Sequence, residues 1–192
     1  MTDPGDVEPA AQPPDTREMR PNLVGSAGVS LRPGRMSDVA ALCGILRDPE
    51  VVRWWGDPEE PSEVEAKLLG DSYAVLLVVE VDRQVAGGIE YWEENEPAYR
   101  HAGIDIYLSS NWQGRGVGTQ AVSLLADFLF DVRDHRRLTI DPAVTNLRAI
   151  RSYEKVGFRR VGVMREYERA PDGTYHDGLL MDLLRSERRR TS

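Results

Sequence analysis

One nine-residue segment constrains the fold of this chain more than any other. It reads Asn-Trp-Gln-Gly-Arg-Gly-Val-Gly-Thr over residues 111–119, between a strand-like run at 102–108 and an amphipathic helical stretch at 117–132. Glycines let backbone amides approach an anion closely, and the start of the following helix adds about half a unit of positive charge. A tight turn between a strand and a helix would use the same glycines. The pattern therefore predicts either a pyrophosphate-binding loop or such a turn.

The glycine spacing excludes two common phosphate-binding loops. A P-loop has Lys-Ser or Lys-Thr after its last glycine, and here Gly118 is followed directly by Thr119. A Rossmann loop has the spacing G-x-G-x-x-G, whereas Gly114, Gly116 and Gly118 follow one another at intervals of two. The segment contains neither motif.

The apolar pattern along the rest of the chain predicts alternating strands and helices. Strands are predicted at 29–32, 73–81, 84–91, 102–108, 137–140, 158–164 and 175–184, with hairpin turns at 82–83 and 171–173. Helices are predicted after the N-cap Ser37, at 49–56, from a capping box of Ser62 and Glu65 to about residue 69, over 117–132, and from the N-cap Asn146 to Gly157. This order is typical of the α/β or α+β class, with a mixed sheet flanked by helices.

Length and charge narrow the organisation and the partners. The 192 residues fit one domain, predicted at 29–186, with a disordered proline-rich leader at 1–28 and a frayed basic tail at 187–192. No apolar run is long enough to cross a bilayer and no signal-peptide pattern is visible, so we expect a cytoplasmic protein without membrane contact. The net charge of −8 disfavours nucleic acid and favours cationic ligands.

Two segments together resemble the GCN5-related N-acetyltransferase (GNAT) superfamily. Gln113-x-x-Gly116-x-Gly118 is similar to the loop with which these enzymes bind the pyrophosphate of coenzyme A. The run from Asn146 through Tyr153 to Gly157-Phe158 resembles their second acetyl-coenzyme A element. The resemblance covers nearly all of 29–186 in the same order of elements. It implies a single GNAT-like domain with a mostly antiparallel sheet, and acetyl-coenzyme A as co-substrate.

A narrower resemblance points to the aminoglycoside 6'-N-acetyltransferases. The segments that carry it are Val52-Arg53-Trp54-Trp55-Gly56, Gly103-Ile104-Asp105, and Asp141-Pro142 followed by Asn146-Leu147-Arg148-Ala149-Ile150-Arg151. Two features depart from that group: Glu90 on its strand, and a longer stretch at 167–182 that is closer to acetyltransferases of protein N-termini or of other small amines. The resemblance implies direct transfer of an acetyl group to a primary amine, with an aminoglycoside-like cation as the leading acceptor.

The resemblance also implies which residues bind the cofactor. They are Leu108, Gln113, Gly114, Arg115, Gly116, Val117, Gly118, Thr119, Asn146, Ala149 and Tyr153. Tyr153 is also the candidate acid, because a phenol of reference pKa about 10 held beside the sulfur can protonate a thiolate of about 8.5. Packing at a helix end would explain the same tyrosine, since Leu147 and Ile150 share its stripe on the helix.

The acceptor side is expected to be acidic and aromatic. Asp105 and Glu90 interrupt apolar strands, and the resemblance implies that their side chains line the acceptor site and that one of them removes the amine proton, with Asp105 preferred. Strand alternation, which turns every second residue to solvent, explains both acids as well. Trp54, Trp55 and Asp141 are further candidates for acceptor binding. The alternatives are that the two tryptophans belong to the core and that Asp141 opens a turn before Pro142.

Other polar groups leave alternatives open. The acidic run at 93–96 is either a solvated loop or a focus for a cationic substrate. His101, His135 and His176 lack metal-ligand spacing, so no metal is expected. The rival functions are acetylation of protein N-termini or of another small metabolite amine and, in a different class, a non-catalytic acyl-coenzyme A sensor. The expected partner is a small cationic amine, and the protein is expected to be a monomer or a homodimer.

Overall fold

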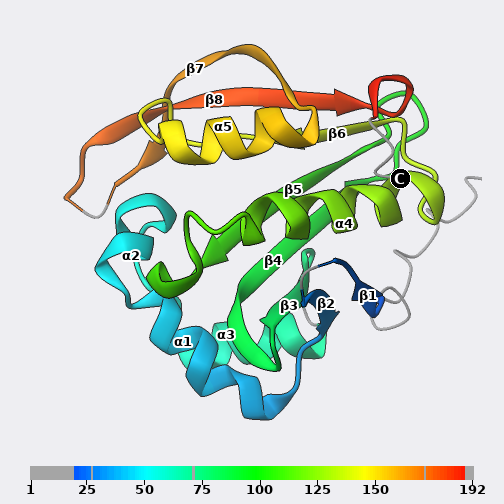
Figure 1. The fold of residues 1–192 in the computed structure, drawn as a ribbon. Coiled ribbons are helices and arrows are strands. Elements are labelled where there is room, and N and C mark those ends of the chain that lie inside the picture. The colour runs from blue at the N-terminus through cyan, green and yellow to red at the C-terminus, as the bar shows by residue number, and fades with distance from the viewer. Residues whose placement is uncertain (1–19, 27, 71, 171, 189–192) are drawn as a thin grey trace, which may run out of the picture.

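The strands of the chain form a single twisted sheet. A computed structural model describes residues 20–188 apart from positions 27, 71 and 171 (Figure 1). The strands are β1 (Leu23–Val24), β2 (Val29–Pro33), β3 (Val75–Val81), β4 (Gln84–Glu94), β5 (His101–Leu108), β6 (Arg137–Ile140), β7 (Arg159–Arg169) and β8 (Tyr175–Leu184). Their order in the sheet is β1-β2-β3-β4-β5-β6-β8-β7, and every neighbouring pair is antiparallel except β5 and β6. The expected α/β class with a mixed, mostly antiparallel sheet is confirmed.

Helices cover both faces of this sheet. They are α1 (Val39–Leu46), α2 (Pro49–Trp55), α3 (Pro61–Leu69), α4 (Val117–Asp131) and α5 (Leu147–Val156), with short 3-10 turns at Met36–Asp38, Ser110–Trp112 and Arg185–Glu187. The core residues of α4 and α5 pack with one face of the sheet, and those of α1, α2 and α3 pack with the other. In β3, Leu77 and Val79 belong to the first core while Leu76 and Val78 belong to the second. This is why β3 is a continuous apolar run, since both of its faces are buried.

The sheet opens between β5 and β6. These two strands pair in parallel at only two positions, Ala102 with Leu138 and Gly103 with Thr139. Beyond Thr139, the other side of β6 stays paired with β8, and the segment after it continues along β8 through a bridge between Ala143 and Gly178. Among the residues that the structure describes, no strand therefore pairs with the second half of β5 on its β6 side, which leaves backbone groups there for a ligand.

Two predicted helix starts are wrong. Ser37 lies inside the 3-10 turn, and α1 begins after Asp38, whose carboxylate accepts a hydrogen bond from the Arg35 amide at 2.7 Å and binds Arg32. The capping box of α3 is formed by Glu60 and Glu63. Pro61 at the first helical position moves this start forward, because its fixed φ suits the first turn of a helix. The predicted cap Asn146 is confirmed, and the helix predicted at 49–56 is observed as Pro49–Trp55, with Asp48 as its N-cap.

The first half of the acidic run at 93–96 is part of a strand. Glu93 and Glu94 lie in β4, which pairs with β5 as far as Glu94 opposite His101, so this half of the run is not a loop. Glu93 is largely buried, and it binds Arg133 at 3.1 Å and His135 at 2.6 Å. It is therefore not available to attract a substrate.

The predicted domain boundaries also change at both ends. Within the predicted leader, β1 pairs with β2, and residues 1–19 lie outside the described residues. At the other end Arg188 binds Asp127 and Asp131, while 189–192 are not described. In the described part of the chain, no helix is long and apolar enough to span a membrane.

Candidate active site

The glycine-rich segment forms the turn between β5 and α4. Gly114 and Gly116 have φ values of 73° and 82°, a left-handed backbone that side chains with a Cβ rarely adopt. A Cβ added at either position would meet no heavy atom within 4 Å. Glycine is therefore favoured at these positions by the backbone conformation and not by close neighbours. The space around the loop is open. Gly116 is the N-cap of the 15-residue helix α4, whose first amides have no partner within the helix.

Contacts within the protein hold this loop in place. The Gln113 side-chain amide donates a hydrogen bond to the Leu108 carbonyl at 2.7 Å, which closes the loop onto the end of β5. The hydroxyls of Thr119 on α4 and Ser152 on α5 lie 2.6 Å apart and join the two helices. Gly118 lies in this junction, because a Cβ there would stand 3.4 Å from Leu108. These contacts fix the orientation of the start of α4 relative to β5 and α5.

A cavity of about 520 Å³ extends from this loop toward α2. Its lining includes most of the residues predicted from the sequence: Trp54, Trp55, Leu108, Gln113, Gly114, Gly116, Gly118, Thr119, Asn146, Ala149 and Tyr153. Two of the predicted cofactor-binding residues are not in it. Val117 is buried in the core, and the Arg115 guanidinium lies over the ring of Trp112 at 5.5 Å. Asp105, Glu90 and Asp141 do not line this cavity either.

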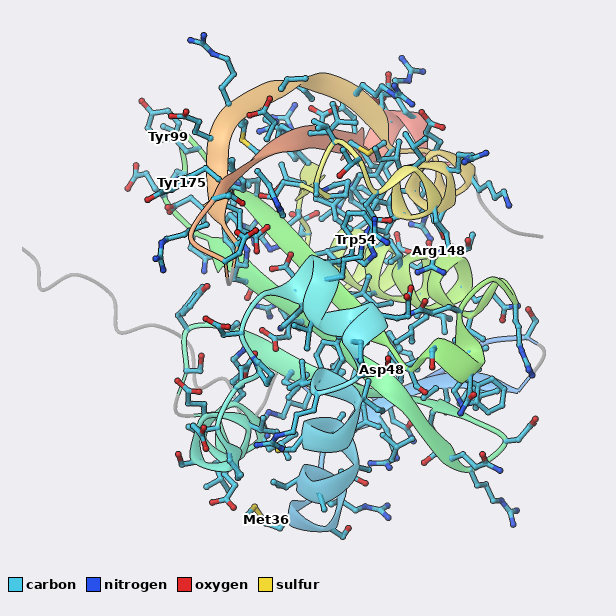
Figure 2. All side chains as sticks on the ribbon, turned by 90° about the vertical axis from the view of Figure 1, so that its left-hand side faces the viewer. Met36, Asp48, Trp54, Tyr99, Arg148 and Tyr175 are labelled. Carbon is cyan, nitrogen blue, oxygen red and sulfur yellow. The ribbon has the colours of Figure 1, made fainter. Side chains whose placement is uncertain are left out.

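Three basic side chains of the cavity were missed by sequence reasoning. Arg148, Arg151 and Lys155 of α5 line the cavity together with Trp54 of α2, and Figure 2 labels Arg148 and Trp54. The spacing of three and four residues between these basic side chains places them on one side of a helix, so the sequence pattern could have predicted that they lie together. With the open glycine loop, they give the cavity the positive groups that a multiply phosphorylated ligand requires.

Acidic side chains from three parts of the fold gather near Tyr153, which lines the cavity. Burial and the negative charges of Asp141 and Glu90 raise the pKa of Asp105 to about 7. The Tyr167 hydroxyl donates a hydrogen bond of 2.7 Å to Asp141, and burial together with Asp141 raises the pKa of Glu168. We call Asp105, Asp141 and Glu168 the acidic site. Its carboxylates come from β5, the segment after β6, and β7, so only the tertiary structure brings them together.

A bulge in β7 contributes Tyr167 and Glu168 to this site. The register between β7 and β8 shifts between Met164 and Glu168, and Glu166 in the bulge has a φ of 49°. The Tyr167 ring covers Gly178, where an added Cβ would stand 2.7 Å from the ring. Bulges redirect side chains next to functional sites. No sequence pattern in this stretch predicted the bulge.

Tyr153 lies between the cavity and the acidic site. Its side chain is almost fully buried, and burial followed by the charges of Asp105 and Asp141 raises the pKa of its phenol. The phenol therefore stays protonated at neutral pH. Because both acids act on Tyr153, the structure brings together three of the predicted residues that are far apart in the sequence.

The aromatic wall of the cavity comes from α2 and β5. The Trp55 ring meets the Tyr107 ring edge to face at 4.7 Å, and Tyr107 lies across Gly88, where a Cβ would stand 2.5 Å from the tyrosine ring. Trp55 also donates a hydrogen bond of 3.4 Å to Glu59, and the Arg53 guanidinium lies over Trp54 at 4.7 Å. The two tryptophans are thus at the cavity wall and only partly in the core.

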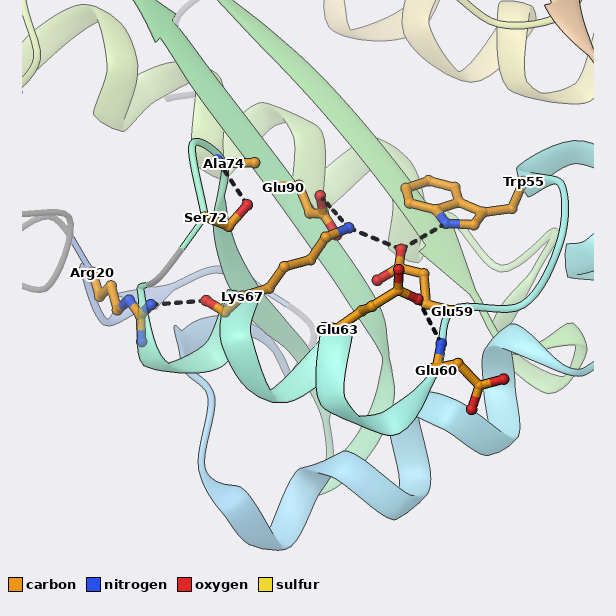
Figure 3. A network of polar contacts seen from close by, with 9 residues as sticks. All are labelled: Arg20, Trp55, Glu59, Glu60, Glu63, Lys67, Ser72, Ala74 and Glu90. Carbon is orange, nitrogen blue, oxygen red and sulfur yellow. Dashed lines mark hydrogen bonds and ion pairs between the residues drawn. The ribbon is translucent and has the colours of Figure 1, made fainter.

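Glu90 is already occupied by a cation of the protein. It lies directly opposite Asp105 in the β4–β5 register, and the Lys67 ammonium binds its two oxygens at 2.9 and 3.1 Å. Lys67 also binds Glu59 at 2.8 Å (Figure 3). Burial raises the pKa of Glu90 while Lys67 opposes that shift. Of the two candidate bases, Glu90 is the one that binds a cation, and no ion pair of Asp105 occurs among the described residues.

The fold and the site define a class of protein in which an open glycine loop at a helix start, together with basic side chains, can hold a phosphate-bearing ligand. Residues 40–158 match the model of the acetyltransferase (GNAT) family. The chain belongs to this family. It is an acetyl-coenzyme A-dependent N-acetyltransferase, as its similarity to amine acetyltransferases also indicates.

Known relatives support this assignment. The chain is 33% identical over 164 residues to aminoglycoside N(6')-acetyltransferase type 1 of Klebsiella pneumoniae, covering 76% of this chain and 79% of the relative. It is 31% identical over 160 residues to spermidine N(1)-acetyltransferase of Escherichia coli K12, covering 80% and 84%. The structure of RimJ from Mycobacterium smegmatis in complex with CoA-disulfide superimposes with a TM-score of 0.76 at 25% identity, covering 90% of each chain.

Proposed function

We propose that this enzyme acetylates a primary amine of a small polycation, with aminoglycosides as the leading class of acceptor. The observation that carries the proposal is the acidic site, in which β5, the segment after β6 and the bulge of β7 bring three carboxylates together near Tyr153. A molecule with several ammonium groups would satisfy these carboxylates, because unpaired charges in a buried site are costly. Two relatives named for an aminoglycoside and for spermidine support the same class.

The cavity fits acetyl-coenzyme A through the protein's own groups. We expect the amides at the start of α4 to bind the pyrophosphate, while Arg148, Arg151 and Lys155 neutralise phosphate charge. When bound, the co-substrate supplies an activated acetyl thioester. The unpaired half of β5 can donate a backbone amide to the thioester oxygen, which gains negative charge during attack.

Asp105 is our candidate for the general base. The attacking nitrogen must be neutral, so a proton has to leave it as the new carbon–nitrogen bond forms and the carbon–sulfur bond breaks. With a pKa raised to about 7, Asp105 accepts a proton far more readily near neutral pH than an ordinary aspartate does. Asp141 and Glu168 would bind neighbouring ammonium groups and thereby orient the reacting amine.

Tyr153 is our candidate for the group that stabilises the departing thiolate. Its raised pKa makes complete proton transfer to sulfur unfavourable in the absence of substrate. A cationic acceptor bound at Asp105 and Asp141 would offset two of the causes of that rise. We therefore expect Tyr153 to donate a hydrogen bond to the sulfur, and its proton as the bond breaks, only when the acceptor is in place.

The test is release of coenzyme A thiol with three groups of acceptors: aminoglycosides, polyamines such as spermidine, and peptides with free N-termini. We expect aminoglycosides to react with the highest kcat/KM. Asp141→Asn should weaken a multiply charged acceptor about 10- to 100-fold, since a charge-assisted hydrogen bond contributes about 1.5–3 kcal/mol. The KM for acetyl-coenzyme A should not change.

Asp82→Asn, which alters an exposed acid in the turn between β3 and β4, is the matched control and should behave like the wild type. Preference for spermidine would keep the polycation but replace the aminoglycoside. Preference for singly charged amines or peptides, with Asp141→Asn silent, would overturn the proposal.

A further inference from the structure

A cation of the protein itself is bound between two carboxylates beside the acidic site. Lys67, in the last turn of α3, points from the helix toward β4 and contacts Glu59 and Glu90 (Figure 3). Its ammonium makes three short contacts, one to Glu59 at 2.8 Å and two to Glu90 at 2.9 and 3.1 Å. A protonated amine has three N–H donors, so the two carboxylates use its full donor capacity.

This ion-pair cluster of Glu59, Lys67 and Glu90 faces the same pocket as the acidic site. Glu90 is the register partner of Asp105, and the positive charge of Lys67 acts on Asp105. Glu59 accepts a hydrogen bond from Trp55, which lines the cavity. The cluster is therefore part of the wall on which an acceptor would bind.

The cluster is also within reach of a small ligand. The Lys67 and Glu59 side chains are 21% and 17% exposed, and that of Glu90 is 7% exposed. In the loop before it, Gly56 lies beside Glu168: an added Cβ there would stand 4.0 Å from the Glu168 carboxylate. The ion-pair cluster and the acidic site thus lie on the two sides of the loop that follows α2.

We propose that Lys67 determines acceptor specificity by occupying a place that a substrate ammonium group would otherwise take. A polyamine can bind by placing a primary ammonium group between two carboxylates. In this protein the Lys67 ammonium occupies that position between Glu59 and Glu90. Lys67 thereby leaves the acidic site as the cation-binding part of the pocket and limits how many ammonium groups the pocket binds. This inference rests on the proposed polycationic acceptor.

The experiment compares binding of putrescine, spermidine and spermine, which carry two, three and four amines, to the wild type and to Lys67→Met. Binding is measured by calorimetry at constant ionic strength without acetyl-coenzyme A, so the result does not depend on turnover. We expect Lys67→Met to bind spermine at least about tenfold more tightly than the wild type does, and to gain less for putrescine. Two unpaired carboxylates would provide a new place for one ammonium group.

A double variant supplies the matched control. Lys67→Met/Glu90→Gln has the same net charge as the wild type but lacks one of the paired carboxylates, so the gain for spermine should be lost. A merely structural ion pair would make both variants less stable and would leave the ratio of spermine to putrescine affinity unchanged. That unchanged ratio in folded Lys67→Met would overturn the proposal.

Loss of the buried cation could unfold Lys67→Met, and a second variant covers that case. Lys67→Gln keeps amide donors for both carboxylates and should show the same change of ratio. If neither variant folds alone, the shift of the melting temperature on adding spermine is measured at equal ionic strength. A larger shift for the variants than for the wild type supports the inference, and the absence of a larger shift refutes it. Wild-type protein that acetylates no polycation would refute the proposed function while leaving this binding test readable.

Discussion

Replacing Asp105 by asparagine should make the protein more stable at high pH while it impairs turnover. The pKa of Asp105 is raised from 3.8 to about 7, first by burial and then by the charge of Asp141. Between these values the folded protein keeps a proton that the unfolded chain has lost. The unfolded state then binds fewer protons, so the free energy of unfolding falls as pH rises through this window. Asparagine removes that loss, because it has no charge to bury.

The size of the effect follows from the same two pKa values. They lie about three pH units apart, and each unit corresponds to 1.36 kcal/mol, which sets an upper bound of about 4 kcal/mol. Because Asp105 is only partly buried by its surface area, we expect a gain of about 1–4 kcal/mol above pH 7.5 and almost none at pH 4. In a domain of this size, 1 kcal/mol shifts the Tm by about 2–4 °C.

Urea unfolding of Asp105→Asn and wild type at pH 4 and pH 8 measures this difference, with Asp57→Asn as the exposed control. Turnover of Asp105→Asn should fall about 10²- to 10⁴-fold, the usual contribution of a general base. A polycationic acceptor should stabilise the wild type more than the variant, because an opposite charge favours ionised Asp105. Equal stability changes at both pH values, or a variant less stable than wild type at pH 8, would refute the reasoning.

The remaining predictions concern the phenol, the glycine loop and the basic side of α5. Tyr153→Phe should lower kcat about 10²- to 10⁴-fold in single-turnover assays with little change in cofactor affinity, and near-normal turnover would leave Tyr153 a packing residue. Gly116→Ala, at a φ of 82°, should cost about 1–3 kcal/mol and weaken acetyl-coenzyme A, whereas Gly44→Ala, inside α1 with no atom within 4 Å of its new Cβ, should stabilise the fold by about 0.5–1 kcal/mol in urea unfolding. Arg151→Ala should raise the KM for acetyl-coenzyme A in a salt-dependent manner without changing acceptor affinity, and an unchanged KM would remove Arg151 from the cofactor site.

Local signals in the sequence were sufficient to predict the glycine loop before α4 and most of the helices and strands. Gly114 and Gly116 are required by their own backbone conformations, and Asn146 caps α5 through an amide three residues away. Such interactions lie within a few residues of chain, so spacing alone reveals them. The failures at Ser37 and Ser62 were also local: Asp38 and Pro61 competed for the same helix starts and prevailed.

Contacts between residues far apart in the sequence determined the partners of the acidic side chains. The sequence placed Asp105 and Glu90 on strands, but it could not distinguish them, because Lys67 reaches Glu90 from 23 residues away. Likewise Tyr167 reaches Asp141 across 26 residues, after a bulge in β7 that no spacing announced. By itself the sequence determined the helices, the strands and the loop at the start of α4, since these depend on neighbouring residues. Which carboxylates remain unpaired, and hence the charge and the pKa values of the acceptor pocket, was decided only when the sheet brought β4, β5 and β7 together with α3, because electrostatic interactions depend on distance in space and on burial.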